Sequence, residues 1–152
     1  MKWSPSKNET HVMIPSTATE WVVGNGQYNE VSRTQLRLRK VNRLKRIVIG
    51  NECFGKVRVV ELDGLIELES VVIGQKSFTY AKTNDAIVIW KRTDGVCRIV
   101  NCSKLKSIWI DAYTFGDYRS FELNNLPSLQ SIDIGYRCFF YVSSFSLTGL
   151  ID

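Results

Sequence analysis

The chain has 152 residues, of which 44% are hydrophobic and 23% charged, and it carries a net charge of +5. This composition is ordinary for a soluble globular domain and excludes a disordered chain. The longest apolar runs, such as residues 86–90, are far shorter than the roughly 18 residues that cross a bilayer, so we expect no membrane span. The four cysteines lack C-x-x-C spacing and His11 is the only histidine, so we expect buried free thiols, no metal site and no cofactor.

Residues 1–17 form a polar segment or cap in front of a single repeat domain that spans residues 18–152. The segment contains lysines without an apolar stretch behind them, which is unlike a secretory signal, so we expect an intracellular, cytoplasmic protein. The first repeat lies near 18–43. Its apolar positions, interrupted by two extra residues, are Ala18, Trp21, Val23, Tyr28, Val31, Leu36, Leu38 and Val41.

The second repeat, 44–67, shows the pattern without a gap. Two short alternating pieces, I-x-I and V-x-L, are too short for helices and predict short β-strands. Gly50 follows the first piece, at a corner that needs either a positive φ or close backbone packing. The inward positions are Leu44, Ile47, Ile49, Phe54, Val57, Val60, Leu62 and Leu65.

The third repeat, 68–104, carries about 13 extra residues. Its apolar positions are Leu68, Val71, Ile73, Phe78, Ala81, Cys97, Ile99 and Cys102. The insertion, 79–96, predicts a β-hairpin with Asp94 and Gly95 in its turn and residues 86–90 as the outgoing strand. Two interpretations remain open: a functional loop that breaks a regular array, or a cover for the neighbouring face.

The fourth and fifth repeats, 105–128 and 129–152, return to the 24-residue period without gaps. Asp111 replaces the corner glycine in the fourth repeat, and Pro127 fits a turn before the fifth. Stacking equivalent pieces as parallel strands about 4.8 Å apart would form two continuous sheets. The sequence therefore predicts a mainly β protein, a right-handed parallel-β solenoid of about five coils with very little helix.

The repeat resembles a known family. The motif L-x-x-I-x-I-G-x-x-x-F-x-x-V-x-x-F-x-L-x-x-L, clearest in SLQSIDIGYRCFFYVSSFSLTGL and RLKRIVIGNECFGKVRVVELDGL, is similar to that of protist leucine-rich-repeat proteins related to bacterial BspA-like surface proteins. The resemblance covers residues 18–152. It implies a curved solenoid that presents its repeats for protein or cell-surface contact, with no catalytic residue to carry over. The chain departs from the motif by its insertion, by Asp111 and by lacking an export signal.

A binding face is predicted by the residue inside each I-x-I piece, which should point to solvent. Four of these five residues are apolar, and apolar stripes with an aromatic anchor mark interaction sites. Covering of the stripe by another segment is the alternative. The candidate partner-binding residues, with Trp90 from the insertion added, are Val22, Val48, Val72, Trp109, Asp133 and Trp90.

A basic cluster offers a second candidate surface, which would suit nucleic acid or an anionic surface. Its members alternate with inward apolar residues and lack interleaved aromatic residues for base stacking, which favours a solvated face. They are Arg33, Arg37, Arg39, Lys40, Arg43, Lys45 and Arg46. The outward residue inside the second strand of each coil forms another row: Arg37, Glu61, Arg98, Glu122 and Ser146. The first four alternate in charge between neighbouring coils, so we expect them to stabilise the strand register.

Catalysis has little support in the sequence. One histidine in the polar segment makes a nucleophilic relay improbable, and the nearest approach to a carboxylate pair is Asp111 with Asp133. A β-helix enzyme acting on acidic polysaccharide is therefore the weakest alternative. We expect a non-enzymatic scaffold that binds a protein partner. Because the last coil ends at Leu150 without a polar cap, two alternatives stay open: self-association through that end, or a chain that is part of a longer array.

Overall fold

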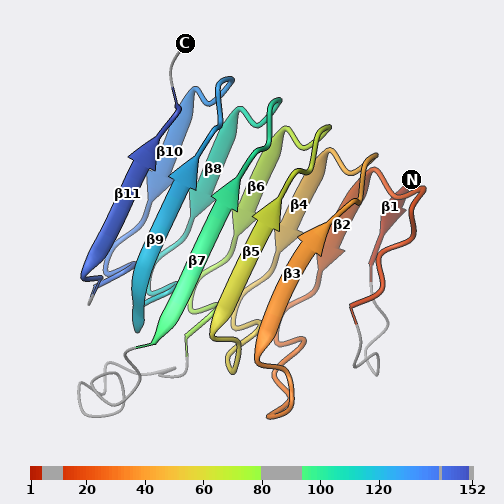
Figure 1. The fold of residues 1–152 in the computed structure, drawn as a ribbon. Coiled ribbons are helices and arrows are strands. Elements are labelled where there is room, and N and C mark those ends of the chain that lie inside the picture. Colours follow the sequence, from red (N-terminus) through yellow and green to blue (C-terminus); the bar gives the residue numbers. More distant parts are fainter. Residues whose placement is uncertain (5–11, 80–93, 141, 151–152) are drawn as a thin grey trace.

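The computed structural model describes residues 1–4, 12–79, 94–140 and 142–150. Within them the chain winds as a parallel β-solenoid of about five coils, and no helix occurs in these residues. Two sheets lie face to face, with the N-terminus at one end of the stack and the C-terminus at the other (Figure 1). The predicted mainly β solenoid is confirmed.

Each coil contributes one strand to each sheet. The six-stranded sheet has the order β1 (Lys2–Trp3), β2 (Glu20–Val23), β4 (Arg46–Ile49), β6 (Ser70–Ile73), β8 (Ser107–Ile110) and β10 (Ser131–Ile134). The five-stranded sheet has the order β3 (Gln35–Arg39), β5 (Val59–Asp63), β7 (Gly95–Val100), β9 (Tyr118–Asn124) and β11 (Ser144–Thr148). All pairings are parallel.

The register follows the predicted period. Ile47 pairs with Val71, Val71 with Ile108, and Ile108 with Ile132, so residues at equivalent repeat positions are neighbours in the sheet. The predicted inward residues of the second coil are all buried in a single core. The fourth coil has its buried residues at the same repeat positions: Leu105, Ile108, Ile110, Phe115, Tyr118, Phe121, Leu123 and Leu126. A period of 24 residues therefore sets both the strand pairing and the core.

Aromatic rings form a ladder through one corner of the solenoid. Tyr28, Phe54, Phe78, Phe115 and Phe139 stack in succession, with ring centroids 4.8 to 4.9 Å apart. All five residues have positive φ angles, between 50° and 61°. The sequence predicted that these residues are inward but did not predict their left-handed backbone.

The glycine that follows the first strand is required by packing rather than by its φ angle. A Cβ on Gly74 would lie 2.7 Å from the carbonyl carbon of Gly50, and one on Gly135 would lie 2.8 Å from the backbone nitrogen of Ala112. Neither glycine has a positive φ. Of the two reasons expected for this position, close backbone packing is therefore the correct one.

The first coil corrects one sequence expectation. Val31 was expected to point inward, but it is 81% exposed. Arg33 takes the equivalent place two residues before β3, and its guanidinium lies 4.8 Å from the centre of the Tyr28 ring. The two extra residues therefore lie between Tyr28 and Arg33, which moves Val31 out to solvent.

The insertion is only partly described. Gly95, expected in the hairpin turn, opens β7 and pairs with Tyr118, whose ring would lie 2.7 Å from a Cβ at this position. The expected outgoing strand, 86–90, and Ala81 lie outside the described residues. Pro127 and Ser128 form the predicted turn, closed by a 3.1 Å hydrogen bond from the Leu129 N–H to the Leu126 carbonyl.

The two ends of the solenoid differ. At the N-terminal end β1 pairs with β2, and Trp3, Val12 and Ile14 pack against the core, so this segment acts as a cap. At the C-terminal end β10 and β11 are the outermost strands of the two sheets.

Candidate functional site

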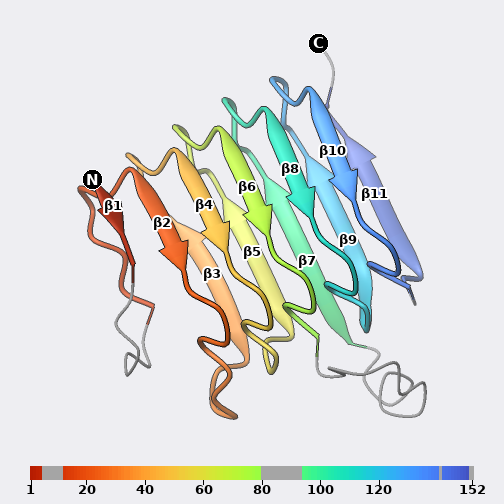
Figure 2. The same ribbon diagram turned by 180° about the vertical axis from the view of Figure 1, so that it is seen from behind.

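The predicted outward residues of the I-x-I strands form one continuous row on the six-stranded sheet. Val22 pairs with Val48, Val48 with Val72, Val72 with Trp109, and Trp109 with Asp133. The row crosses the face that Figure 2 shows in front, from β2 to β10. The structure thus brings together five of the six candidate partner-binding residues; the sixth, Trp90, lies outside the described residues.

Trp109 is the most prominent side chain of this row. It is 42% exposed, whereas the three valines of the row are half-buried. Its two neighbours in the row are Val72 and Asp133. The tryptophan therefore stands near one end of an apolar strip that ends in a carboxylate.

Small residues flank the strip near Trp109. The outward positions two residues earlier are Ser70, Ser107 and Ser131, which also pair with one another in register. The positions two residues later are Gly74, Asp111 and Gly135. Because few long side chains rise beside the strip here, a partner surface could approach the sheet and Trp109 closely.

The basic residues do not form one patch. Arg37 and Arg39 lie on β3 of the five-stranded sheet, whereas Arg46 opens β4 in the other sheet and Lys45 directly precedes it. Arg33 is half-buried and lies 3.6 Å from a carboxylate oxygen of Glu30. Lys40 and Arg43 are exposed in the connection between the two sheets.

Part of the basic cluster is engaged by a buried carboxylate. Glu61 pairs with Arg37 at 3.4 Å, with Arg98 at 2.9 Å and also with Arg39. Arg98 in turn lies 2.6 Å from Glu122. Hydrogen bonds from Arg39 and Arg98 hold the pKa of Glu61 below its usual value, against the effect of its burial. The charge alternation expected along this row is therefore present as a network of ion pairs.

A second buried carboxylate was missed by the sequence analysis. Asp117 is almost fully buried and lies 3.6 Å from Arg58, which also pairs with the exposed Asp94. Asp94 directly precedes β7. These residues come from different coils and share no local motif, so no spacing in the sequence could have indicated this cluster.

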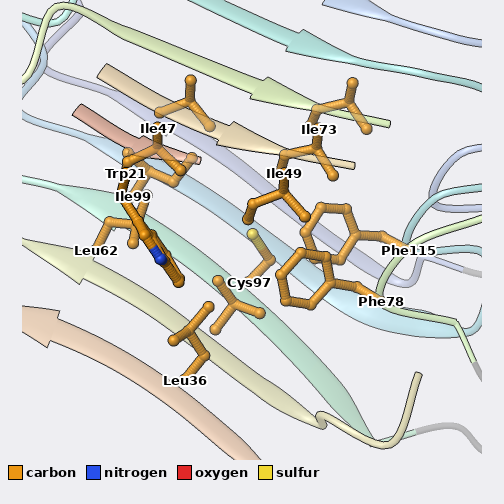
Figure 3. A pocket seen from close by; sticks show the side chains of 13 residues that line it. Trp21, Leu36, Ile47, Ile49, Leu62, Ile73, Phe78, Cys97, Ile99 and Phe115 are labelled. Atoms are coloured by element: carbon orange, nitrogen blue, oxygen red, sulfur yellow. The ribbon is translucent and has the colours of Figure 1, made fainter. Parts of the chain in front are cut away.

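One small cavity between the sheets is apolar. Side chains of both sheets converge there on a cavity of about 10 Å³ lined by apolar residues, among them Trp21, Ile49 and Phe78 (Figure 3). A space of this size is at the lower limit for one water molecule, which would also need polar partners. The cavity is therefore a packing defect rather than a ligand site.

The cysteines lie where the sequence predicted free thiols. Cys53, Cys97 and Cys102 are buried, Cys138 is half-buried, and none is in a disulfide. Burial raises the pKa of the Cys97 thiol, which keeps it protonated. The Cys53 and Cys138 thiols donate to the carbonyls of Gly24 and Asp111 in the preceding coil. These thiols are structural donors.

The two carboxylates considered for catalysis occupy different repeat positions. Asp133 is exposed in β10, whereas Asp111 follows β8 and its Oδ1 accepts a 2.7 Å hydrogen bond from the Ala112 N–H. In the described part of the chain no group of three or more histidine, cysteine or acidic residues is placed to hold a metal ion. Nor do those residues include a helix long and apolar enough to span a membrane.

Comparison with known proteins identifies no relative of this chain, so its family is not assigned. No protein-family model matches the chain, and neither a curated protein nor a solved structure is significantly similar to it. What the strand order and register establish is a parallel β-solenoid built from coils of about 24 residues.

Proposed function

We propose that this protein is a non-enzymatic, protein-binding scaffold that uses the outer face of its six-stranded sheet. The observation that carries the proposal is the in-register row of Val22, Val48, Val72 and Trp109, with a tryptophan that is 42% exposed. Exposed apolar strips mark interaction surfaces, and tryptophan is enriched among the residues that dominate binding energy. Repeat proteins commonly bind through such extended faces.

We further infer that the coils are of the leucine-rich-repeat type found in BspA-like proteins. Their 24-residue spacing, the two short strands in each coil and the phenylalanine between them support this inference. Proteins with that repeat present it for protein or cell-surface contact, which agrees with a recognition role for the outer face.

A pulldown from whole-cell lysate tests the function, with the wild type, Trp109→Ala and Ile66→Ala as baits. Ile66 is 49% exposed but lies outside the strip, so Ile66→Ala is a matched control for the loss of exposed apolar surface. Washes with nuclease and with high salt remove partners held through nucleic acid or through charge alone. We expect a protein that the wild type and Ile66→Ala retain and that Trp109→Ala loses.

Two outcomes would contradict the proposal. Equal retention of every partner by all three baits would remove the strip from the binding surface. A signal that disappears with nuclease or salt, equally for all three baits, would instead favour the basic residues and a nucleic-acid or anionic partner.

A further inference from the structure

Strand β3 has an open edge beside the N-terminal cap. Each coil runs from the six-stranded sheet to the five-stranded sheet and back, so a solenoid strand beside β3 would come from the chain between β1 and β2. The described residues of that stretch, Ser4 and 12–19, form no strand. β3 is accordingly the outermost strand of its sheet (Figure 1). The open edge thus follows from the path that the chain takes into its first coil.

The direction of the backbone groups in β3 is set by its pairing with β5. The Thr34 carbonyl accepts hydrogen bonds from the N–H groups of Arg58 and Val59, at 2.7 and 3.3 Å. Because the backbone groups of successive residues in a strand point to opposite edges, every second residue from Thr34 onward faces β5. The residues between them present their N–H and C=O groups at the open edge: Gln35, Arg37 and Arg39.

A pocket of about 310 Å³ lies along this edge. Val12 and Met13 line it from the cap, and Arg33 and residues 35–38 line it from the other side. The two leucines of β3 belong to the buried core and give the pocket an apolar floor, whereas Met13 is 71% exposed at its wall. The volume lies in the range of roughly 300 to 1,000 Å³ that is usual for ligand sites, so the pocket can accept side chains of a partner.

The open edge is basic. β3 carries Arg37 and Arg39, and no acidic residue occurs between residues 31 and 45. The two carboxylate oxygens of Glu61 are shared among Arg37, Arg39 and Arg98. Each guanidinium has five N–H donors, and the side chains of Arg37 and Arg39 are 45% and 56% exposed. Donors therefore remain for the carboxylates of a partner.

We propose that β3 binds an extended, acidic segment of a protein partner as an added strand. The backbone of the segment pairs with the open edge, its apolar side chains enter the pocket, and its carboxylates bind Arg37 and Arg39. Alternating apolar and acidic residues meet both requirements, because a strand places successive side chains on opposite faces. Single-stranded nucleic acid fits this site less well, since the pocket lining includes no aromatic residue for base stacking.

Fluorescence polarisation with a short labelled peptide of alternating valine and glutamate tests the site on the whole chain. A peptide with lysine in place of glutamate is the control probe, and only the glutamate peptide should bind. Arg37→Gln should weaken its binding about tenfold or more, because a charge-assisted pair is lost. Arg43→Gln removes the same charge from the exposed connection after β3 and should change the affinity less than about twofold.

Substitutions at Gln35 test the backbone pairing. Gln35→Pro removes an N–H that faces the open edge, while the charge of β3 and its hydrogen bonds to β5 are kept. Gln35→Thr loses the same side chain but keeps the N–H, so it is the matched control. We expect Gln35→Pro to bind the glutamate peptide at least about threefold more weakly than Gln35→Thr.

Hydrogen exchange on the wild type tests the same pairing without a substitution. The glutamate peptide should slow the exchange of the N–H groups of Arg37 and Arg39, which face the open edge. The N–H groups of Leu36 and Leu38, which face β5, should be unaffected.

Four results would overturn the proposal. They are no binding of the glutamate peptide by the wild type at about 1 mM, unchanged exchange at Arg37 and Arg39 in the complex, tighter binding of a single-stranded oligonucleotide, or peptide binding that appears only after residues 5–11 are replaced by glycine and serine. The last result would assign the edge to the chain itself.

The β3 site and the proposed binding face can fail independently. Trp109 lies on the six-stranded sheet, so Trp109→Ala should bind the glutamate peptide as the wild type does. Arg37→Gln should in turn retain the partner that Trp109→Ala loses in the pulldown.

Discussion

At the residue scale, Glu61 is the most constrained charged side chain of the five-stranded sheet. It is buried on β5, yet its two carboxylate oxygens accept hydrogen bonds from Arg37, Arg39 and Arg98, which lie on the two neighbouring strands. A buried charge is tolerated only when it is paired and hydrogen-bonded in this way. Glu61 therefore ties the register of β3, β5 and β7 together.

Replacing Glu61 with glutamine should make stability less dependent on pH. The folded-state pKa of Glu61 is lowered, so its contribution is fully present above the unfolded-state value of about 4.3 and is lost as the pH falls through the folded-state value. At pH 7 we expect Glu61→Gln to lower the free energy of unfolding by about 1 to 3 kcal/mol. Urea denaturation at pH 7 and near pH 3 should show the difference from wild type shrinking in acid.

Glu67→Gln is the control for this experiment. Glu67 pairs with Lys104 at 2.9 Å, but both side chains are substantially exposed, so its loss should cost no more than about 1 kcal/mol. A Glu61→Gln effect as small as that of Glu67→Gln, or one that grows in acid, would contradict the assigned role of the network.

At the element scale, each coil is held in place by its corners. The left-handed backbone at Phe54, Phe78, Phe115 and Phe139 costs on the order of 1 to 2 kcal/mol at each residue. Burial of the ring and stacking against the next coil offset this cost, since each buried phenylalanine contributes about 1.5 to 3 kcal/mol. The corner therefore exists because the coils are stacked.

Gly74→Ala should disturb the backbone directly after β6, in the connection that also carries Phe78. The new Cβ would lie 2.7 Å from the carbonyl carbon of Gly50, and backbone cannot yield as a flexible side chain can. We expect a loss of about 1 to 3 kcal/mol in the free energy of unfolding, measured by urea denaturation.

Gly64→Asn provides the comparison for Gly74→Ala. Gly64 has a φ of 67° with no heavy atom within 4 Å of its Cβ position, and Asn101 and Asn125 have similar φ angles after the corresponding strands of the next two coils. Asparagine should therefore cost well under about 1 kcal/mol there. If Gly64→Asn proved the more harmful change, backbone packing would not be the reason for glycine at position 74.

At the scale of the whole molecule, the solenoid is a linear stack in which the strands of each coil pair with those of the adjacent coils. Strand pairing occurs between adjacent coils throughout the described residues, and the core runs continuously from the N-terminal cap to the last coil. Stability in such arrays is approximately a sum over coils and their interfaces. The same substitution should consequently cost different amounts at different places along the stack.

Ile108→Ala and Ile132→Ala test this expectation at equivalent positions of adjacent coils. Ile108 is 1% exposed between two coils, whereas Ile132 is 38% exposed at the open end. Truncation of Ile108 should cost about 2 to 5 kcal/mol, and that of Ile132 less than about 1.5 kcal/mol. Urea denaturation measures both losses, and equal losses at the two positions would contradict the expected dependence on burial.

Much of the architecture could be predicted from the pattern of apolar residues. A side-chain period of two within each strand and a period of 24 between coils fix which residues face inward, so Ile47, Val71 and Ile108 were placed correctly. The outward row that ends at Trp109 and Asp133 follows from the same register. Whether that row binds a protein stays a prediction.

The sequence by itself determined the repeat, the strand register and the two faces of each sheet, because these depend on local alternation that recurs along the chain. Only the tertiary structure decided that Asp117 pairs with Arg58, and that the segment before the first coil adds β1 to the six-stranded sheet. It also decided that Arg33 rather than Val31 packs against the first coil, and that the stacked rings take a left-handed backbone. These features arise from contacts between coils, where the distance in space is set by stacking and not by separation along the sequence.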